Sequence, residues 1–161
     1  MISLSKRKEG FTIVELLIVI VVIGILAGLV ITTYNGIQQK ARNTERTTDL
    51  KTFQGQLEAY YANNGSYPGT DSLGGTSATN VTFIQASMKG MDKETLRDPK
   101  GTAGDYSLNN GTTVGGNKYT YNPTKDDNTA CTSTAAGDCT KYTLTAVPEG
   151  STTNIVLTSL N

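Results

Sequence analysis

An apolar run from Phe11 to Ile31 constrains this chain of 161 residues more than any other feature. Only Thr12, Glu15, Gly24 and Gly28 interrupt its apolar side chains. As an α-helix the run would extend about 31 Å, close to the roughly 30 Å hydrocarbon core of a bilayer. Lipid offers no hydrogen-bond partners to a backbone, so we predict a helix that spans a membrane.

A cleaved secretory signal peptide is the alternative, because the basic residues Lys6, Arg7 and Lys8 precede the run. The run is long for such a peptide, and the sequence after it, Thr32-Thr33-Tyr34-Asn35, has no small-residue cleavage site. We therefore expect a retained span. Positive charges follow the run as well as precede it, but those at residues 6–8 lie closer, which favours an N-terminus on the inner side.

Glu15 is the only charged residue of the run. A charge at the centre of a bilayer costs about 2.5–3.5 kcal/mol on insertion scales, and less near the boundary, where Glu15 lies. One interpretation is a carboxylate tolerated at the membrane boundary. The other is a carboxylate that pairs with a cation. Residues 11–31 contain no Lys or Arg, so that cation would come from another molecule or from a newly formed N-terminus.

The segment Gly10-Phe11-Thr12-Ile13-Val14-Glu15-Leu16-Leu17, after its short basic leader, resembles the class III signal peptide of type IV pilins and pseudopilins. The resemblance implies that prepilin peptidase cleaves between Gly10 and Phe11 and that Phe11 becomes N-methylated. It also implies that Glu15 neutralises the N-terminus of a neighbouring subunit. A buried carboxylate satisfied at one axial offset would then set the register of assembly.

Two glycines of the run, Gly24 and Gly28, have the spacing that lets membrane helices approach closely. The alternative is that glycine is simply frequent in membrane spans. The family often has a proline shortly after this region, whereas the first proline here is Pro68. Asn35-Gly36 is therefore the weakest predicted point of the helix.

Residues 32–64 are predicted to continue the helix in amphipathic form. Leu50, Phe53 and Leu57 recur at spacings of three and four, which indicates one buried face. Asn63-Asn64-Gly65 is a favourable helix stop. Charges of both signs are predicted to form, for the most part, a solvated surface: Lys40, Arg42, Glu45, Arg46, Asp49 and Lys51.

Residues 65–161 are rich in Gly, Thr, Asn and Tyr and contain four strand candidates. These are residues 106–108, 118–122, 141–147 and 154–160. The predicted fold class is α+β, in which a long N-terminal helix packs against a C-terminal antiparallel β-sheet, as in the pilin fold. The expected domains are a cleaved leader (1–10), a transmembrane and filament-core helix (11–31), an amphipathic helix (32–64) and a globular domain (65–161) with a loop at 131–139.

Cys131 and Cys139 are the only cysteines of a chain without histidine, which makes a zinc site a poor expectation. We expect a disulfide, and hence an oxidising compartment; two buried thiols are the alternative. Oxygen-bearing residues near this loop form a weak calcium candidate, although short acidic loops are usually only solvated. These residues are Asp126, Asp127, Asn128 and Asp138. No other metal and no cofactor is predicted.

The resemblance implies a structural subunit, a pilin, of a type IV pilus-like filament. Its partners would be further copies of itself, the prepilin peptidase, a platform protein and an assembly ATPase. It would wait in the bacterial cytoplasmic membrane as a single-pass protein with its N-terminus inside, and then enter an extracellular filament.

Three alternatives remain at this stage. The first is a pseudopilin of a type II secretion or DNA-uptake system, because the turn Asp98-Pro99-Lys100-Gly101 faintly resembles the Asp-Pro-x-Gly segment of pseudopilins. Nucleic acid would be a partner only in a DNA-uptake role. The second is a membrane-anchored binding or adhesion module. An enzyme, the third, is not predicted, because the chain lacks histidine, a Gly-x-Ser-x-Gly segment and a phosphate-binding loop.

Overall fold

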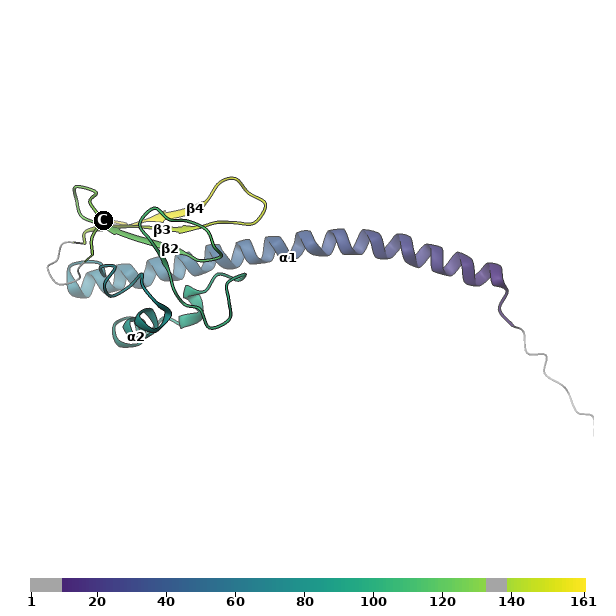
Figure 1. Cartoon of the computed structure of the whole chain (residues 1–161), viewed down its shortest axis with the longest axis horizontal. Coiled ribbons are helices and arrows are strands. Elements are labelled where there is room, and N and C mark those ends of the chain that lie inside the picture. Colours follow the sequence, from purple (N-terminus) through teal and green to yellow (C-terminus); the bar gives the residue numbers. More distant parts are fainter. Residues whose placement is uncertain (1–9, 133–138) are drawn as a thin grey trace, which may run out of the picture. The chain divides into compact units, whose positions relative to one another are not determined.

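A computed structural model describes residues 10–132 and 139–161 (Figure 1). In chain order two helices, α1 (Ile13–Asn64) and α2 (Ser77–Ser87), and a 3-10 helix (Lys93–Leu96) precede the strands of the sheet. The strands are β1 (Asn109–Asn110), β2 (Thr120–Thr124), β3 (Lys141–Ala146) and β4 (Ile155–Thr158). The predicted α+β class is confirmed. The chain separates into two units between Gln38 and Gln39, and each is described by itself.

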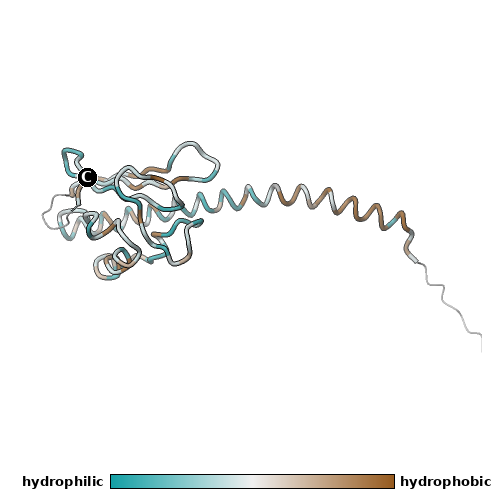
Figure 2. Tube along the Cα trace, in the orientation of Figure 1, coloured by the Kyte–Doolittle hydropathy of each residue, from teal (hydrophilic) through white to brown (hydrophobic). Residues whose placement is uncertain are grey.

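The N-terminal unit consists of the first part of α1, which is strongly hydrophobic along its length (Figure 2). Its large apolar side chains are all exposed, from 47 % at Val22 to 94 % at Phe11. The helix continues through Asn35 and Gly36 without interruption, although propensity makes this its weakest point. No part of the described chain covers this apolar surface.

In the C-terminal unit the strands lie in the order β1-β2-β3-β4. Strands β2, β3 and β4 are antiparallel neighbours, with Tyr121 opposite Leu144 and Leu144 opposite Leu157. Strand β1 pairs with β2 in parallel, so the sheet is mixed rather than wholly antiparallel. The short connection from β1 to β2 can return to pair in parallel because it contains glycines with positive φ, including Gly115 and Gly116.

The first predicted strand, at residues 106–108, is wrong, because these residues form no strand and β1 begins only at Asn109. The backbone N–H of Tyr106 donates to the hydroxyl of Ser77, and that of Ser107 donates to the carboxylate of Asp105. Side chains thus take the donors that a strand ladder would use, and pairing begins only at Asn109.

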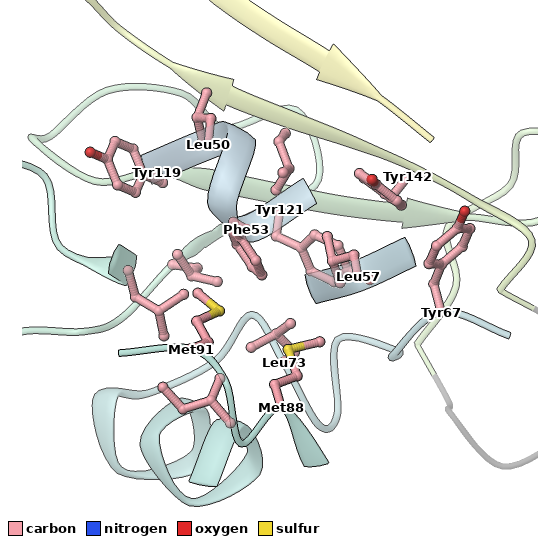
Figure 3. Packing of buried hydrophobic residues seen from close by; sticks show 14 of the residues in the cluster. Leu50, Phe53, Leu57, Tyr67, Leu73, Met88, Met91, Tyr119, Tyr121 and Tyr142 are labelled. Carbon is pink, nitrogen blue, oxygen red and sulfur yellow. The ribbon is translucent and has the colours of Figure 1, made fainter. Parts of the chain in front are cut away.

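The core forms where α1 packs under the sheet and beside the segment that contains α2 (Figure 3). Leu50, Phe53 and Leu57 are fully buried, as their spacing predicts. Around them the core contains mainly Tyr67, Leu73, Ile84, Met88, Leu96, Tyr119, Tyr121, Tyr142 and Leu144. The helix ends as predicted: Gly65 has φ of 74°, and its N–H donates to the carbonyl of Tyr61 at 2.7 Å.

A disulfide joins Cys131 and Cys139, whose Cα atoms are 5.5 Å apart. Both cysteines are buried, and their backbones connect three segments of the unit. Tyr67 donates its N–H to the Cys139 carbonyl, while the N–H of Cys131 donates to the carbonyl of Pro123 in β2. The cross-link therefore fixes the chain after α1 to the ends of β2 and β3.

Candidate functional site

The start of α1 is closed by a reciprocal pair of residues. Thr12 donates its backbone N–H and its hydroxyl to Oε2 of Glu15, at 2.9 Å and 2.7 Å. In return the N–H of Glu15 donates to the hydroxyl oxygen of Thr12 at 3.2 Å, and the Thr12 carbonyl accepts from Leu16. This is a capping box, in which a threonine before the helix and a glutamate three residues later satisfy otherwise free N–H groups.

The capping box uses only part of the carboxylate of Glu15. Within the described residues its second oxygen, Oε1, accepts no hydrogen bond. Residues 10–38, the described part of this unit, contain no Lys or Arg, so none of them supplies a side-chain cation to Glu15. The carboxylate of Glu15 is therefore held in place by local hydrogen bonds, and no side chain of residues 10–38 neutralises its charge.

The other residues predicted to act along this helix lie on its open surface. A Cβ atom added at Gly24 or Gly28 would meet no heavy atom within 4 Å. The two glycines are thus available to a neighbouring helix, and their role in packing stays a prediction. Gly10 and Phe11 precede α1 and are exposed, while the basic leader at residues 6–8 lies outside the described residues.

A buried ion pair in the C-terminal unit corrects one prediction. Arg46 is 1 % exposed rather than solvated, and its guanidinium binds both oxygens of Asp98 at 2.7 Å and 2.8 Å. Asp98, 3 % exposed, also accepts the backbone N–H of Lys100. Burial of two charges is tolerated because the pair is bidentate and its remaining groups are hydrogen-bonded. The turn at 98–101 is thereby fixed to α1.

Glu149 extends this network. Arg42 donates to both of its oxygens, at 2.6 Å and 2.8 Å, and Arg46 and Lys100 approach the same carboxylate at 3.2 Å and 3.0 Å. The hydrogen bonds from Arg42, and after them those from Lys100 and Arg46, hold the pKa of Glu149 well below its usual range. Asn43 adds a reciprocal pair of hydrogen bonds with the backbone of Glu149.

The calcium candidates are occupied by other contacts. Asp126 accepts from the hydroxyl of Thr140 and lies 3.9 Å from the ammonium of Lys141. Asp127 accepts from the N–H and hydroxyl of Thr129. Asp138 lies outside the described residues. Among the described residues no group of three or more acidic, cysteine or histidine side chains could hold a metal ion. Calcium binding stays a prediction.

One serine and one lysine lie close enough to suggest nucleophilic chemistry. Nζ of Lys118 donates to Oγ of Ser107 at 2.6 Å, and it lies 3.1 Å from Oδ2 of Asp105. Lys118 thus pairs with the carboxylate of Asp105 and donates a hydrogen bond to the hydroxyl of Ser107. A base that activates a serine must instead accept the proton of the serine hydroxyl. This geometry supports a structural role for the three residues.

Only α1, among the helices of the described residues, is long and apolar enough to cross a membrane by length and composition. Its capped start lies next to the predicted cleavage site. The helix therefore combines a membrane-compatible surface with one fixed, unneutralised carboxylate near its N-terminal end.

Residues 5–31 match the family model described as the prokaryotic N-terminal methylation motif. The chain is also similar to the type II secretion system core protein G of three bacteria. Identity is 35 % over 68 residues for Dickeya chrysanthemi, 38 % over 66 for Klebsiella pneumoniae and 34 % over 67 for Escherichia coli K12. No solved structure matches the chain.

These similarities cover 41–42 % of this chain, and the chain spans less than half of each relative, 44–47 % of its length. The matched motif contains Gly10, Phe11 and Glu15, the residues singled out by the sequence. The N-terminal signal and the long apolar helix are thus the part of the chain that resembles these proteins, and they support a place in the type IV pilin and pseudopilin family.

Proposed function

We propose that this protein is a pseudopilin, a structural subunit of a short filament that serves a secretion machine of the type II kind. The observation that carries the proposal is the methylation motif at residues 5–31, which coincides with an apolar helix bearing one carboxylate. The similarity to the type II secretion core protein G favours a pseudopilin over the pilus subunit that the sequence first suggested.

In this proposal the peptidase cuts between Gly10 and Phe11, and the new N-terminal amine of Phe11 becomes methylated. The amine carries a positive charge at neutral pH, because its pKa in a model peptide is about 7.7–8. The free oxygen of Glu15 in one subunit binds the amine of the next. A charge pair that forms at only one axial offset would set the stagger between subunits.

The exposed apolar surface of residues 11–37 supports two successive environments. Before assembly it lies in lipid, where exposed apolar side chains are favoured. After assembly the same surface packs against neighbouring copies, with Gly24 and Gly28 allowing close approach. The peptidase, a platform protein and an assembly ATPase are the partners that this route requires. The disulfide supports a position of residues 39–161 on the oxidising side of the membrane.

Mass spectrometry of the protein from its native host tests processing. We expect a mature chain that starts at methylated Phe11. A Gly10→Val variant should remain unprocessed, because a branched side chain replaces glycine at the scissile bond, whereas a Gly55→Ala control should mature normally. An intact Met1 start in cells that contain the peptidase would contradict the proposal and favour the membrane-anchored module.

A deletion strain separates a pseudopilin from a pilus subunit. We expect loss of exported proteins from the culture medium, with recovery on complementation by the wild-type chain. Long surface filaments at native expression, together with unchanged export in the deletion strain, would assign the chain to a pilus instead.

A further inference from the structure

A cavity of about 150 Å³ in the C-terminal unit has no part in the proposed function. It lies where α1, the turn at 98–101, the loop at 115–118 and the loop at 147–149 meet. Its charged lining residues are Arg46, Asp98, Lys100, Lys118 and Glu149. The volume is sufficient for a small organic ion.

The charges around this cavity do not balance. Three cations line it, against the two carboxylates of Asp98 and Glu149. The partners that lie behind the lining cancel each other, because Arg42 pairs with Glu149 and Asp105 pairs with Lys118. One positive charge is left over. At the inner side Arg46 and Asp98 are almost completely buried and pair with each other. The excess charge therefore falls to the outer side, where the partly exposed Lys100 shares the carboxylate of Glu149 with Arg42 and Arg46.

The backbone leaves the cavity open on one side. Gly115 and Gly116 have φ of 106° and 68°, and a Cβ atom at either would meet no heavy atom within 4 Å. Their loop is held in place at Gly101, where a Cβ atom would lie 2.9 Å from the Asp98 carbonyl oxygen and 3.1 Å from that of Asn117. The empty space is therefore bounded by a tightly packed turn.

The remaining wall is apolar and one cation is accessible. Val147 and Pro148 contribute the apolar surface. The side chain of Lys100 is 49 % exposed, so its ammonium can reorient from Glu149 toward an incoming anion. Glu149 would keep both of its arginine partners, Arg42 and Arg46. A cationic group beside an apolar wall suits a ligand with one negative charge and a short aliphatic part.

We propose that this cavity binds a small carboxylate. The carboxylate group pairs with Lys100 and neutralises the excess charge, and its aliphatic carbons contact Val147 and Pro148. The same chemistry is available from two sources, a free short-chain carboxylic acid and an Asp or Glu side chain of a second copy of this chain.

Nuclear magnetic resonance of the full chain in detergent micelles tests the proposal. Sodium acetate is added at constant ionic strength, with sodium chloride as the replaced salt, and the amide signals of Gly115 and Gly116 are followed. We expect saturable shifts in the wild type. A Lys100→Gln variant should bind acetate at least about fivefold more weakly, and Lys100→Arg should bind within about twofold of the wild type. Lys51→Gln, which removes an exposed lysine of α1, is the matched control and should bind normally.

Thermal unfolding verifies that each variant is folded. Shifts that do not saturate, that chloride alone reproduces, or that persist unchanged in Lys100→Gln would overturn the proposal. Dilution without acetate identifies the source. Shifts of the same two amides that grow with protein concentration assign the carboxylate to a second copy. Acetate-dependent shifts without any concentration dependence assign it to a free acid.

Discussion

The two units of this protein treat a carboxylate in opposite ways. In residues 10–38, Glu15 is held by the N–H and hydroxyl of Thr12, and these residues contain no Lys or Arg to pair with it. In residues 39–161, Asp98 is almost fully buried and binds the guanidinium of Arg46 through both oxygens. Local hydrogen bonds fix the orientation of the first carboxylate, and a charge within the chain neutralises the second.

This difference indicates where each unit obtains its stability. The C-terminal unit has its core, its buried ion pair and its disulfide within one chain. Residues 10–38 have an exposed apolar surface and a carboxylate that none of their own side chains neutralises, and in the proposed function lipid or another subunit satisfies both. Substitutions in residues 39–161 should therefore change the free energy of unfolding, whereas substitutions near Glu15 should change assembly.

The largest expected effect on stability is at Arg46. An Arg46→Met variant leaves Asp98 buried without its partner, so we expect a loss of about 3–5 kcal/mol in the free energy of unfolding. Urea denaturation of the full chain in detergent, followed by tyrosine fluorescence, measures it. Lys51→Met, at an exposed site of α1, is the control and should change stability by less than about 0.5 kcal/mol.

A second substitution tests whether the unpaired charge is the cause. Adding Asp98→Leu to Arg46→Met removes the buried carboxylate, so the double variant should recover part of the loss. If the double variant lost the sum of the two single effects, the buried pair would not be acting as a unit.

The disulfide should give the next largest effect. Replacing both Cys131 and Cys139 by alanine opens the loop that the disulfide closes between residues eight positions apart in the sequence. The chain-entropy model gives a loss of about 2–3 kcal/mol for a loop of this size. The loss is measured by denaturation of the double variant and of the reduced wild type, each compared with the oxidised wild type. Equal stability of oxidised and reduced wild type would show that the cross-link contributes nothing.

Two glycines in different packing environments should respond with opposite signs. At Gly101 an added Cβ atom would contact two backbone carbonyl oxygens, so Gly101→Ala should destabilise by about 1–2 kcal/mol. At Gly55, within α1, nothing lies within 4 Å, so Gly55→Ala should stabilise by about 0.5–1 kcal/mol through helix propensity. Thermal melts of both variants test the pair, and a shift of the same sign in both would contradict it.

The smallest effect concerns Asp49, whose carboxylate accepts from the hydroxyl of Tyr119 at 2.7 Å. Burial raises the pKa of Asp49 to about 6, against the opposing effect of the Tyr119 hydrogen bond. The folded state thus binds the proton more tightly than the unfolded state, whose pKa is about 3.9. The resulting stability is fully present below pH 4 and is lost as the pH rises through 6.

Asp49→Asn should remove this dependence on pH. After allowance for solvent screening, we expect the variant to be more stable than the wild type by about 1 kcal/mol at pH 7.5. The two proteins should be equally stable at pH 4. The free energy of unfolding of both proteins, measured at both pH values, tests this prediction. A stability difference between variant and wild type that is the same at pH 4 and pH 7.5 would contradict the raised pKa of Asp49.

Sequence periodicity predicted much of this fold because its signals are local. The long apolar helix, the buried face at Leu50, Phe53 and Leu57, and the helix stop at Gly65 each follow from spacing or propensity. Three of the four predicted strands correspond to β2, β3 and β4, and alternating residues marked the first two of these. The parallel pairing of β1 was not predicted, because a strand of two residues has no pattern of its own.

The buried Arg46 was missed, although a signal existed. Arg46 precedes Leu50 by four residues and so lies on the same face of α1 as the core residues. Its charge argued for exposure, and its partner Asp98 is 52 residues away in sequence. Non-local pairs of this kind are fixed by tertiary packing and cannot be read from spacing. The capping box of Thr12 and Glu15 was also missed, although its signal, a threonine three residues before a glutamate, is present in the sequence.

The most direct test of the account is the yield and regularity of the filaments formed when a Glu15→Gln variant is overproduced in the native host, compared with the wild-type chain overproduced in the same way. Glutamine keeps the size of the side chain but removes the charge that would bind the next subunit's amine. We predict a chain processed at Phe11 and a normally stable C-terminal unit, but no regular filaments. Thr33→Val, a conservative change further along α1, should assemble normally. Wild-type yield and spacing from Glu15→Gln would contradict the account.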